Sequence, residues 1–399
     1  MRLSIPANYD DESISALKKF PVTEVYGKLG SDPFGGGRPS YATPPVSRNH
    51  LARHAALLRE SGIRFNYLLN SACQGNSEWG RSWQKRCRRF LDQLGGMGIT
   101  TVTVATPYLL EMVKSHAPHF SVKVSIYAQV DTASRARFWE DLGADAITVE
   151  SFSINRNVKR LRAIRKAVNC DLQLIPNHCC LPNCAMQPYH QVGFAHASDG
   201  GRGLFIDYCL FRCTQLRLET PSLFIRSAWI RPEDCAFYEN LGYESFKLLE
   251  RGMPTTALLH RVKAYAERCS PANLAELLIP YGFRETRAPG PLWFMRHFFR
   301  PLQVNPLRLG ALRRMAERHG MRFPLNQLPV RIHSRLIPDD FVMRTTADTN
   351  CDEACCADGN YCDLLAEKAV EIDETWRSRA LQELNSLCDS LSSGRLWNV

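Results

Sequence analysis

Nine of the fifteen cysteines in this 399-residue chain lie in two short clusters. The first cluster contains Cys179, Cys180, Cys184, Cys209 and Cys213, and the second contains Cys351, Cys355, Cys356 and Cys362. The N-terminal stretch lacks the charged-then-apolar order of a signal peptide, and no run of 18 apolar residues could cross a membrane. We therefore expect a cytoplasmic protein without a membrane span. In that reducing compartment, clustered cysteines more often bind metal or carry out redox chemistry than form disulfides.

The first cluster consists of two Cys-x-x-x-Cys pairs, Cys180/Cys184 and Cys209/Cys213, with 24 residues between them. Residues four apart share one face of a helical turn, so four thiolates can converge. Such a set suits structural zinc or an iron–sulphur cluster, and the spacing, wider than the Cys-x-x-Cys of zinc loops, favours the cluster. Cys179 faces away from Cys180, so we expect only Cys180 of the two to bind. The alternative is a group of buried thiols without a ligand.

The second cluster lies among acidic residues. Its four cysteines, Cys351, Cys355, Cys356 and Cys362, could form another thiolate site, with Asp352, Glu353 and Asp358 as alternative oxygen ligands. Adjacent cysteines strain a four-ligand cage, so a surface redox pair is an equal alternative to a second metal or cluster.

Three further side chains could transfer protons. Glu150, at the end of an expected strand, is the best single carboxylate for acid–base work, and its alternative role is an ion pair with Arg156 or Lys123. His178 and His190 flank the first cysteine cluster, where each could donate a proton or instead form a hydrogen bond to sulphur. The sequence has no G-x-S-x-G and no H-E-x-x-H motif, so hydrolytic alternatives have little support.

The first 250 residues alternate between short β-branched runs and amphipathic stretches, which predicts parallel strands with crossover helices. The expected strands are Leu3–Ala7, Thr23–Gly27, Arg64–Leu69, Thr101–Ala105, Lys123–Tyr127, Ala146–Glu150, Leu172–Pro176, Leu223–Ile230 and Ser245–Leu249. The expected helices include Ser13–Phe20, His50–Ser61, Gln84–Leu94, Ala133–Leu142 and Val158–Val168. Seven or eight such units favour an α/β fold of the closed (β/α) TIM-like barrel type, with chemistry just past the strand ends.

We place this barrel at residues 1–268, with the first cysteine cluster as an insertion, and a smaller C-terminal extension at 269–399 that ends in a helix over Tyr361–Asp389. The formal charge of +10 favours an anionic partner such as a carboxylate metabolite, a phosphate or RNA. Because the arginines are spread along the chain, RNA is the less favoured of these partners.

Several blocks together resemble a known family. They are E-V-Y-G-K-L, F-G-G-G-R-P-S, L-G-A-D-A-I-T-V-E with S-I-N-R-N, N-H-C-C-L-P-N-C, W-I-R-P-E-D and the late C-x-x-x-C-C…N-Y-C. Their order over residues 1–365 is similar to that of the collagenase-like peptidase family of unassigned catalytic type. Better-understood members resemble oxygen-independent hydroxylation proteins that act on ubiquinone precursors, a tRNA uridine or a ribosomal RNA cytidine.

The resemblance implies a [4Fe–4S] cluster on Cys180, Cys184, Cys209 and Cys213, and a prephenate-like anionic co-substrate as the oxygen source. It places Arg38, Asn155 and Arg156 near loop ends where that anion could bind, and it allows a paralogous partner subunit. The cysteine spacing departs from that of the ubiquinone and RNA members, and their Gly-Ser-hydrophobic-Cys block is missing, so the chain is expected to belong to a divergent branch. A peptidase with structural metal-bound cysteines and a non-catalytic partner subunit are the alternatives.

Overall fold

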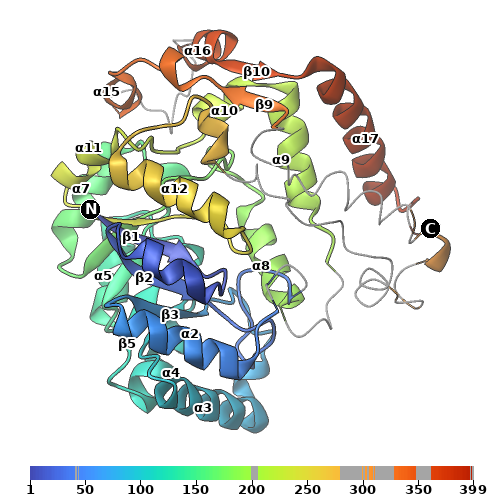
Figure 1. Ribbon diagram of the computed structural model, residues 1–399. Coiled ribbons are helices and arrows are strands. Elements are labelled where there is room, and N and C mark those ends of the chain that lie inside the picture. The colour runs from blue at the N-terminus through green and yellow to red at the C-terminus, as the bar shows by residue number, and fades with distance from the viewer. Residues whose placement is uncertain are drawn as a thin grey trace.

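The computed structural model describes residues 1–40, 43, 45–198, 205–278, 299, 302, 305–308, 310, 328–346, 361–395 and 397. Eight parallel strands follow one another in chain order around a closed barrel, and the last pairs with the first (Figure 1). They are β1 (Arg2–Pro6), β2 (Val22–Gly27), β3 (Arg64–Leu69), β4 (Thr101–Val104), β5 (Ser121–Val124), β6 (Ala146–Thr148), β7 (Asp171–Leu174) and β8 (Ser245–Lys247). The predicted TIM-like barrel is confirmed.

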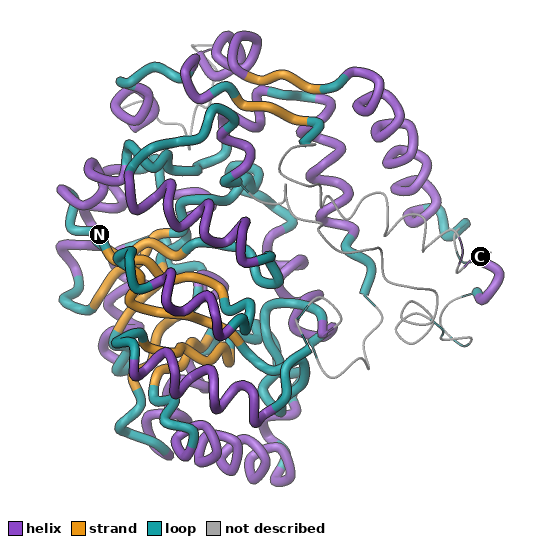
Figure 2. The backbone as a smooth tube through the Cα atoms, in the orientation of Figure 1, coloured by secondary structure: helices purple, strands orange, loops and turns teal. Residues whose placement is uncertain are grey.

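Helices cover the outside of the barrel (Figure 2). In the first six units they are α1 (Ile14–Leu17), α2 (Arg48–Glu60), α3 (Arg81–Gly96), α4 (Pro107–His116), α5 (Ala133–Asp141), α6 (Ser151–Ile154) and α7 (Val158–Ala167). Local sequence signals set their ends. The Ser47 side chain accepts a hydrogen bond from the His50 amide at the start of α2. Gly62 and Gly143, with φ of 75° and 100°, let the chain leave α2 and α5 in the left-handed conformation.

The connection from β7 to β8 is much longer than the others and carries the first cysteine cluster. It contains α8 (Gln187–Ala197), α9 (Tyr208–Glu219), α10 (Ser222–Arg226) and α11 (Cys235–Asn240). The strand expected at Leu223–Ile230 is wrong, because α10 occupies the first part of this range. Pro221 precedes α10 with φ of −59°, which is already set for a helix start.

After β8 the chain forms α12 (Thr255–Glu267), α15 (Phe341–Thr346), α16 (Tyr361–Ala369) and α17 (Glu374–Ser392). The helix predicted over Tyr361–Asp389 is interrupted by β10 (Val370–Ile372), which pairs antiparallel with β9 (Val330–Ile332). Two β-branched residues favour this short strand, and Asp373 then caps α17 by accepting from the Trp376 amide.

Residues beyond 268 pack in two ways. Leu274, Val330, Phe341 and Leu365 belong to the same hydrophobic core as the barrel, so no separate core divides them from it. Helix α17 instead lies alongside α9 (Figure 1), where Leu384 and Leu387 pack with Phe211 and Leu218 in a small second core. The division at residue 269 stays a prediction. Within the described ranges, no helix has the length and apolar character needed to cross a bilayer.

Candidate functional site

The segment after β7 is fixed from two sides before it reaches the cysteines. The Asn177 amide donates to the carbonyls of Leu249 and Leu277 and accepts from the Leu249 amide, so it joins the end of β7 to the chain beyond β8. The His178 ring is fully buried, with Nε2 3.0 Å from the Ser151 carbonyl, and its Nδ1 accepts from the Cys180 amide. Burial lowers the pKa of His178 to about 3, so the ring is neutral. These contacts support a role in positioning Cys180 rather than in proton donation.

The four predicted ligands lie on two segments of the connection from β7 to β8. Cys180 and Cys184 lie on the loop after β7, and Cys209 and Cys213 lie on α9. Burial raises the pKa of the Cys180, Cys209 and Cys213 thiols, that of Cys209 to about 12, and the neighbouring Cys184 raises all three further. Cys213 in turn raises the pKa of Cys180 and Cys209. The cysteines of the two segments therefore lie near enough to influence one another's ionisation.

Cys179 differs from its neighbour Cys180 in its side-chain contact. Its side chain is 2% exposed, and its Sγ donates to the Ser227 Oγ over 3.7 Å. Adjacent residues of an extended segment point to opposite sides, which accounts for the difference. The arrangement supports the choice of Cys180 over Cys179.

A buried arginine, which the sequence reading missed, accompanies the thiols. Arg217 is 1% exposed, and its guanidinium donates to the Cys179 carbonyl over 2.6 Å and to the Cys213 Sγ over 3.4 Å. It lies four residues after Cys213 on α9, so both side chains share one helix face. This spacing was visible in the sequence. Arg217 opposes the effect of burial on the pKa values of Cys180 and Cys213, so it stabilises their thiolate forms.

The spacing of these thiols bears on which metal group they could hold. Among the described residues, no three His, Cys, Asp or Glu side chains are close enough to enclose a single metal ion. A zinc ion requires its sulphur ligands about 2.3 Å away on all sides. A [4Fe–4S] cluster has a larger body and takes one thiolate at each iron, so its ligands stand further apart. The described residues therefore show no assembled site for a single ion, and the [4Fe–4S] cluster on the four cysteines stays a prediction.

Glu150 lies beside the cysteine loop and is 5% exposed. One carboxylate oxygen accepts from the Gln187 amide at the start of α8, and the other accepts from the Ser153 backbone amide in α6. Burial raises the pKa of Glu150. The two ion pairs considered as alternatives are not its contacts, because Lys123 pairs with Glu24 and Arg156 packs elsewhere.

His190 connects the two halves of the cysteine motif. Its Nε2 lies 2.9 Å from a carboxylate oxygen of Asp207, which caps α9 by accepting from the Leu210 amide. Its ring lies 4.2 Å from the ring of Phe194, centroid to centroid. His190 therefore holds α8 against the start of the helix that carries Cys209.

The three residues expected to bind an anion lie in different surroundings. Arg38 forms a two-pronged ion pair with Glu250, at 3.0 and 2.5 Å, and its guanidinium lies over the Phe194 ring. Arg156 is stacked between Trp229 and Phe341 and donates to the Ile225 carbonyl. Asn155 is fully buried and donates to the carbonyls of Ile175 and Ala228. The contacts of Asn155 and Arg156 are those of packing residues, and their role in binding stays a prediction.

Of the second cysteine cluster, Cys351, Cys355 and Cys356 lie outside the described residues. Cys362 lies in the first turn of α16 and is partly exposed. The metal site predicted there stays a prediction.

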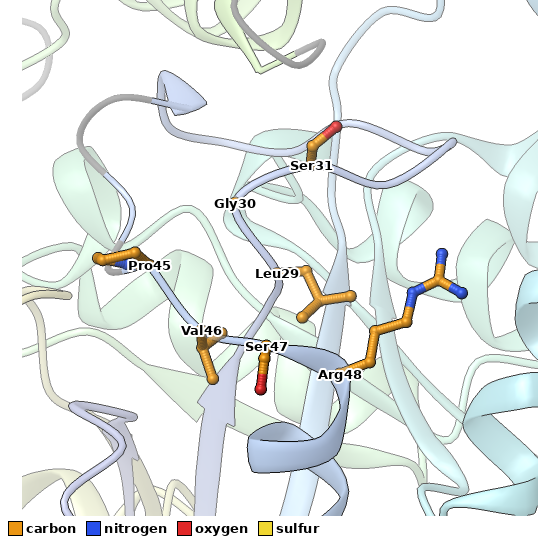
Figure 3. A pocket seen from close by; sticks show the side chains of 7 residues that line it. All are labelled: Leu29, Gly30, Ser31, Pro45, Val46, Ser47 and Arg48. Carbon is orange, nitrogen blue, oxygen red and sulfur yellow. The ribbon is translucent and has the colours of Figure 1, made fainter.

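A surface hollow of about 460 Å³ lies at the connection from β2 to α2, between Leu29–Ser31 and Pro45–Arg48 (Figure 3). Its charged lining residue is Arg48, whose guanidinium donates to the Gln93 side chain. The hollow contains no cysteine or carboxylate and none of the predicted site residues. The cysteine region therefore remains the candidate site.

Comparisons with known proteins point to one family. Residues 40–180 match the model of peptidase family U32. A protein of Methanocaldococcus jannaschii named as an uncharacterized protease is 32% identical over 256 residues, which cover 64% of this chain and 75% of that protein. A solved U32 peptidase structure is 22% identical with a TM-score of 0.48, covering 64% of this chain and 94% of its own. A putative copper homeostasis protein from Streptococcus agalactiae is 15% identical with a TM-score of 0.33, and the match covers 44% of this chain and 89% of that protein.

Proposed function

We propose that this chain, which belongs to peptidase family U32, is an enzyme that holds a [4Fe–4S] cluster on Cys180, Cys184, Cys209 and Cys213. In this proposal it carries out an oxygen-independent hydroxylation, or a related oxidation, of an organic or RNA substrate. The observation that carries the proposal is that Arg217 joins the two cysteine segments, the loop just past β7 and α9, through the Cys179 carbonyl and the Cys213 Sγ, with the Cys179 side chain turned towards Ser227. When bound, the cluster supplies electron transfer.

The surrounding residues fit that role. Arg217 places a buried positive charge against thiols that must ionise in order to bind iron. His178 fixes the Cys180 backbone, and His190 fixes the start of α9 through Asp207. Glu150 combines burial, a raised pKa and a position beside the cysteine loop, so it is the best-placed group to hold or release a proton.

The peptidase alternative has less support from these contacts. A cysteine peptidase needs a thiolate activated by a neighbouring imidazole. Burial raises the pKa of Cys180, Cys209 and Cys213, and the ring nitrogens of His178 bind backbone groups. Such thiols are poor nucleophiles but good metal ligands once ionised by the metal itself.

Anaerobic purification followed by chemical analysis tests the proposal. We expect about four irons and four sulphides per chain, with broad visible absorption. The same preparation should be tested for zinc and for cleavage of unstructured peptides. A colourless, folded protein that contains zinc or no metal, or that cleaves peptides at full rate after iron removal, would contradict the proposal.

A further inference from the structure

Several charged side chains lie in the interior and at the C-terminal mouth of the barrel, and all but the half-buried Arg38 and Glu250 are buried. Three cations there have a carboxylate partner within 3.0 Å. The pairs are Lys123 with Glu24, Lys28 with Asp32, and Arg38 with Glu250. Both carboxylate oxygens of Glu24 accept from Lys123, and both carboxylate oxygens of Glu250 accept from Arg38.

Two more cations lie in the same place without such a partner. Arg251 is 7% exposed, and its buried Nη1 has no hydrogen-bond partner among the described residues. Lys247, the last residue of β8, is also 7% exposed, and its amino group lies over the Tyr26 ring, 4.1 Å from the centroid. A buried guanidinium without an acceptor is costly, so its retention calls for a ligand.

We propose that Arg251 and Lys247 form an anion site at the mouth of the barrel, and that this site takes a small carboxylate. Lys247 ends β8 and Arg251 follows four residues later, directly after the Glu250 that pairs with Arg38, so both cations lie where β8 opens into the mouth. The inference rests on the barrel residues and does not depend on the cysteine cluster.

A glycine loop packs closely against side chains at the mouth. A Cβ atom on Gly36 would lie 2.8 Å from the Lys28 Nζ, and one on Gly37 would lie 2.5 Å from the Tyr127 ring. The loop therefore passes directly over these side chains, and only glycine permits the approach. The same loop carries Arg38, which pairs with Glu250. Glu250 directly precedes Arg251 in the chain.

The hydrogen bonds around the mouth favour a carboxylate over a phosphate. Glycine loops commonly hold phosphate with free backbone amides. Here the Gly36 and Gly37 amides already donate to the Ser198 Oγ and the Asn70 Oδ1, at 2.7 and 3.3 Å. The remaining donors are the guanidinium fork of Arg251 and one ammonium group, which match a planar carboxylate.

The ionisation of both groups supports the same conclusion. Burial, followed by the neighbouring Arg38, lowers the pKa of Arg251. Burial, followed by Lys123, lowers the pKa of Lys247 to about 7. Both cations are therefore disfavoured in the protein alone, and an anion placed between them would relieve this effect.

Calorimetry and thermal unfolding with lactate, malonate and inorganic phosphate at matched ionic strength test the proposal. Lactate or malonate should bind the full-length protein and raise its Tm. Arg251→Gln should weaken this binding at least about tenfold, as expected for a lost charge-assisted hydrogen bond. Without ligand, the variant should be at least as stable as the wild type, because an unpaired buried charge is gone.

Two controls separate a ligand-binding arginine from a structural one. Arg261→Gln removes a fully buried guanidinium that donates to backbone carbonyls, so it should lower Tm. Arg135→Gln removes an exposed guanidinium and should change neither the Tm nor the affinity for carboxylates. Lys247→Met gives a second test of the site should Arg251→Gln fail to fold, and it should also weaken carboxylate binding.

Some results would overturn the proposal. The first is that the wild-type protein binds neither lactate nor malonate, or binds phosphate more tightly than both. The second is that Arg251→Gln and Lys247→Met bind these carboxylates with wild-type affinity. The third is that unliganded Arg251→Gln loses as much stability as Arg261→Gln. Iron is measured in every sample, so that failure of the anion site is distinguished from failure of the iron–sulphur proposal.

Discussion

The cysteine region and the barrel mouth both gather buried groups of one kind, but their charges are opposite. Around Cys180, Cys184, Cys209 and Cys213, groups that become anions on binding metal lie beside one cation, Arg217. At the mouth, Arg251 and Lys247 are cations in excess of the available carboxylates. Burial disfavours the charged forms in both places. Each region therefore suits the ligand that we propose for it, an iron–sulphur cluster in one and a small anion in the other.

The two regions also differ in how rigidly the chain fixes them. The mouth is built from strand ends, and paired side chains from distant strands, such as Lys123 and Glu24, hold it. The cysteine region depends on α9, which gains support on its outer side from α17 near the C-terminal end (Figure 1). We expect the cysteine region to be the more sensitive of the two to changes outside it.

The largest effect is expected from the cysteines themselves. Cys180→Ser, Cys184→Ser, Cys209→Ser and Cys213→Ser should each cost most of the bound iron, because each removes one of four thiolates. Cys179→Ser and Cys87→Ser are matched controls, since both residues are buried but lie outside the group. Iron and sulphide are quantified after anaerobic purification. If any two of the four variants keep the full iron content of the wild type, the assignment of these four cysteines as cluster ligands is wrong.

If the two cysteine clusters are separate, the iron bound at the first cluster should stay in place when serine replaces all four cysteines of the second cluster, Cys351, Cys355, Cys356 and Cys362. Removing the chain beyond residue 350 is a poorer test, because it also removes α17 from α9. The Arg377 side chain of α17 donates to the Leu218 carbonyl at the end of α9.

The sequence predicts the barrel and the cysteine site for different reasons. Strands such as Arg64–Leu69 are short, mostly apolar runs preceded by a turn glycine, Gly62, and local pattern locates them. Cys209 and Cys213 are four residues apart on α9, so spacing alone places them on one helix face, whereas Cys180 and Cys184 lie on a loop. Leu223–Ile230 was mistaken for a strand because a short buried helix has the same apolar composition, and only packing distinguishes them.

The barrel mouth could not be predicted in this way. Arg251 directly follows Glu250 in the sequence. In the structure, however, Glu250 pairs with Arg38, which lies in a loop more than two hundred residues earlier in the chain. Arg156 was assigned to anion binding from its block, yet it is stacked on Trp229 and Phe341. Whether a buried charge has a partner depends on tertiary contacts between distant strands, which spacing does not encode.

The next largest effect tests the support that α17 gives to α9. Leu384→Ala should lower the free energy of unfolding by about 2–5 kcal/mol, because Leu384 is fully buried against Phe211 and Leu218. It should also speed iron loss to a chelator, since α9 carries Cys209 and Cys213. Leu364→Ala is the control, because Leu364 is 46% exposed on α16. Equal iron loss in the two variants would contradict the dependence on α17.

A smaller effect is expected at Arg217. Arg217→Gln removes a positive charge and a hydrogen bond to Cys213, so the bound cluster should become harder to reduce. A loss of about 1.4 kcal/mol corresponds to a shift of roughly 59 mV to more negative potential for one electron. A redox titration followed by electron paramagnetic resonance measures it, and Arg212→Gln on the same helix is the control. A potential that stays unchanged in iron-replete Arg217→Gln would show that Arg217 has only a structural role.

The smallest effect concerns pH and separates the mouth from the cysteine region. Burial, followed by Lys123, lowers the pKa of Lys247 to about 7, well below its ordinary value. Below pH 7 its ammonium group is present to attract an anion, and above pH 7 the neutral amine predominates. Lactate affinity should therefore fall as the pH rises from 6 to 8, by at most about tenfold per unit, with proton uptake on binding near pH 7. The charged or titratable groups that act on Lys247 are Glu24, Tyr26, Lys123, Arg38 and Arg251.

Calorimetry at pH 6, 7 and 8, in two buffers with different ionisation enthalpies, measures both the affinity and the proton uptake. Lys247→Met should bind lactate more weakly and show no fall in affinity over this range. Arg251→Gln should bind lactate more weakly, but its affinity should still fall as the pH rises, because Lys247 remains. Of the groups around Lys247, Glu24 has a pKa lowered to about 2 by Lys123 against the effect of burial, so it stays ionised throughout. A slope that persists in Lys247→Met would mean that another group titrates, and a flat wild-type profile would exclude Lys247 from the anion site.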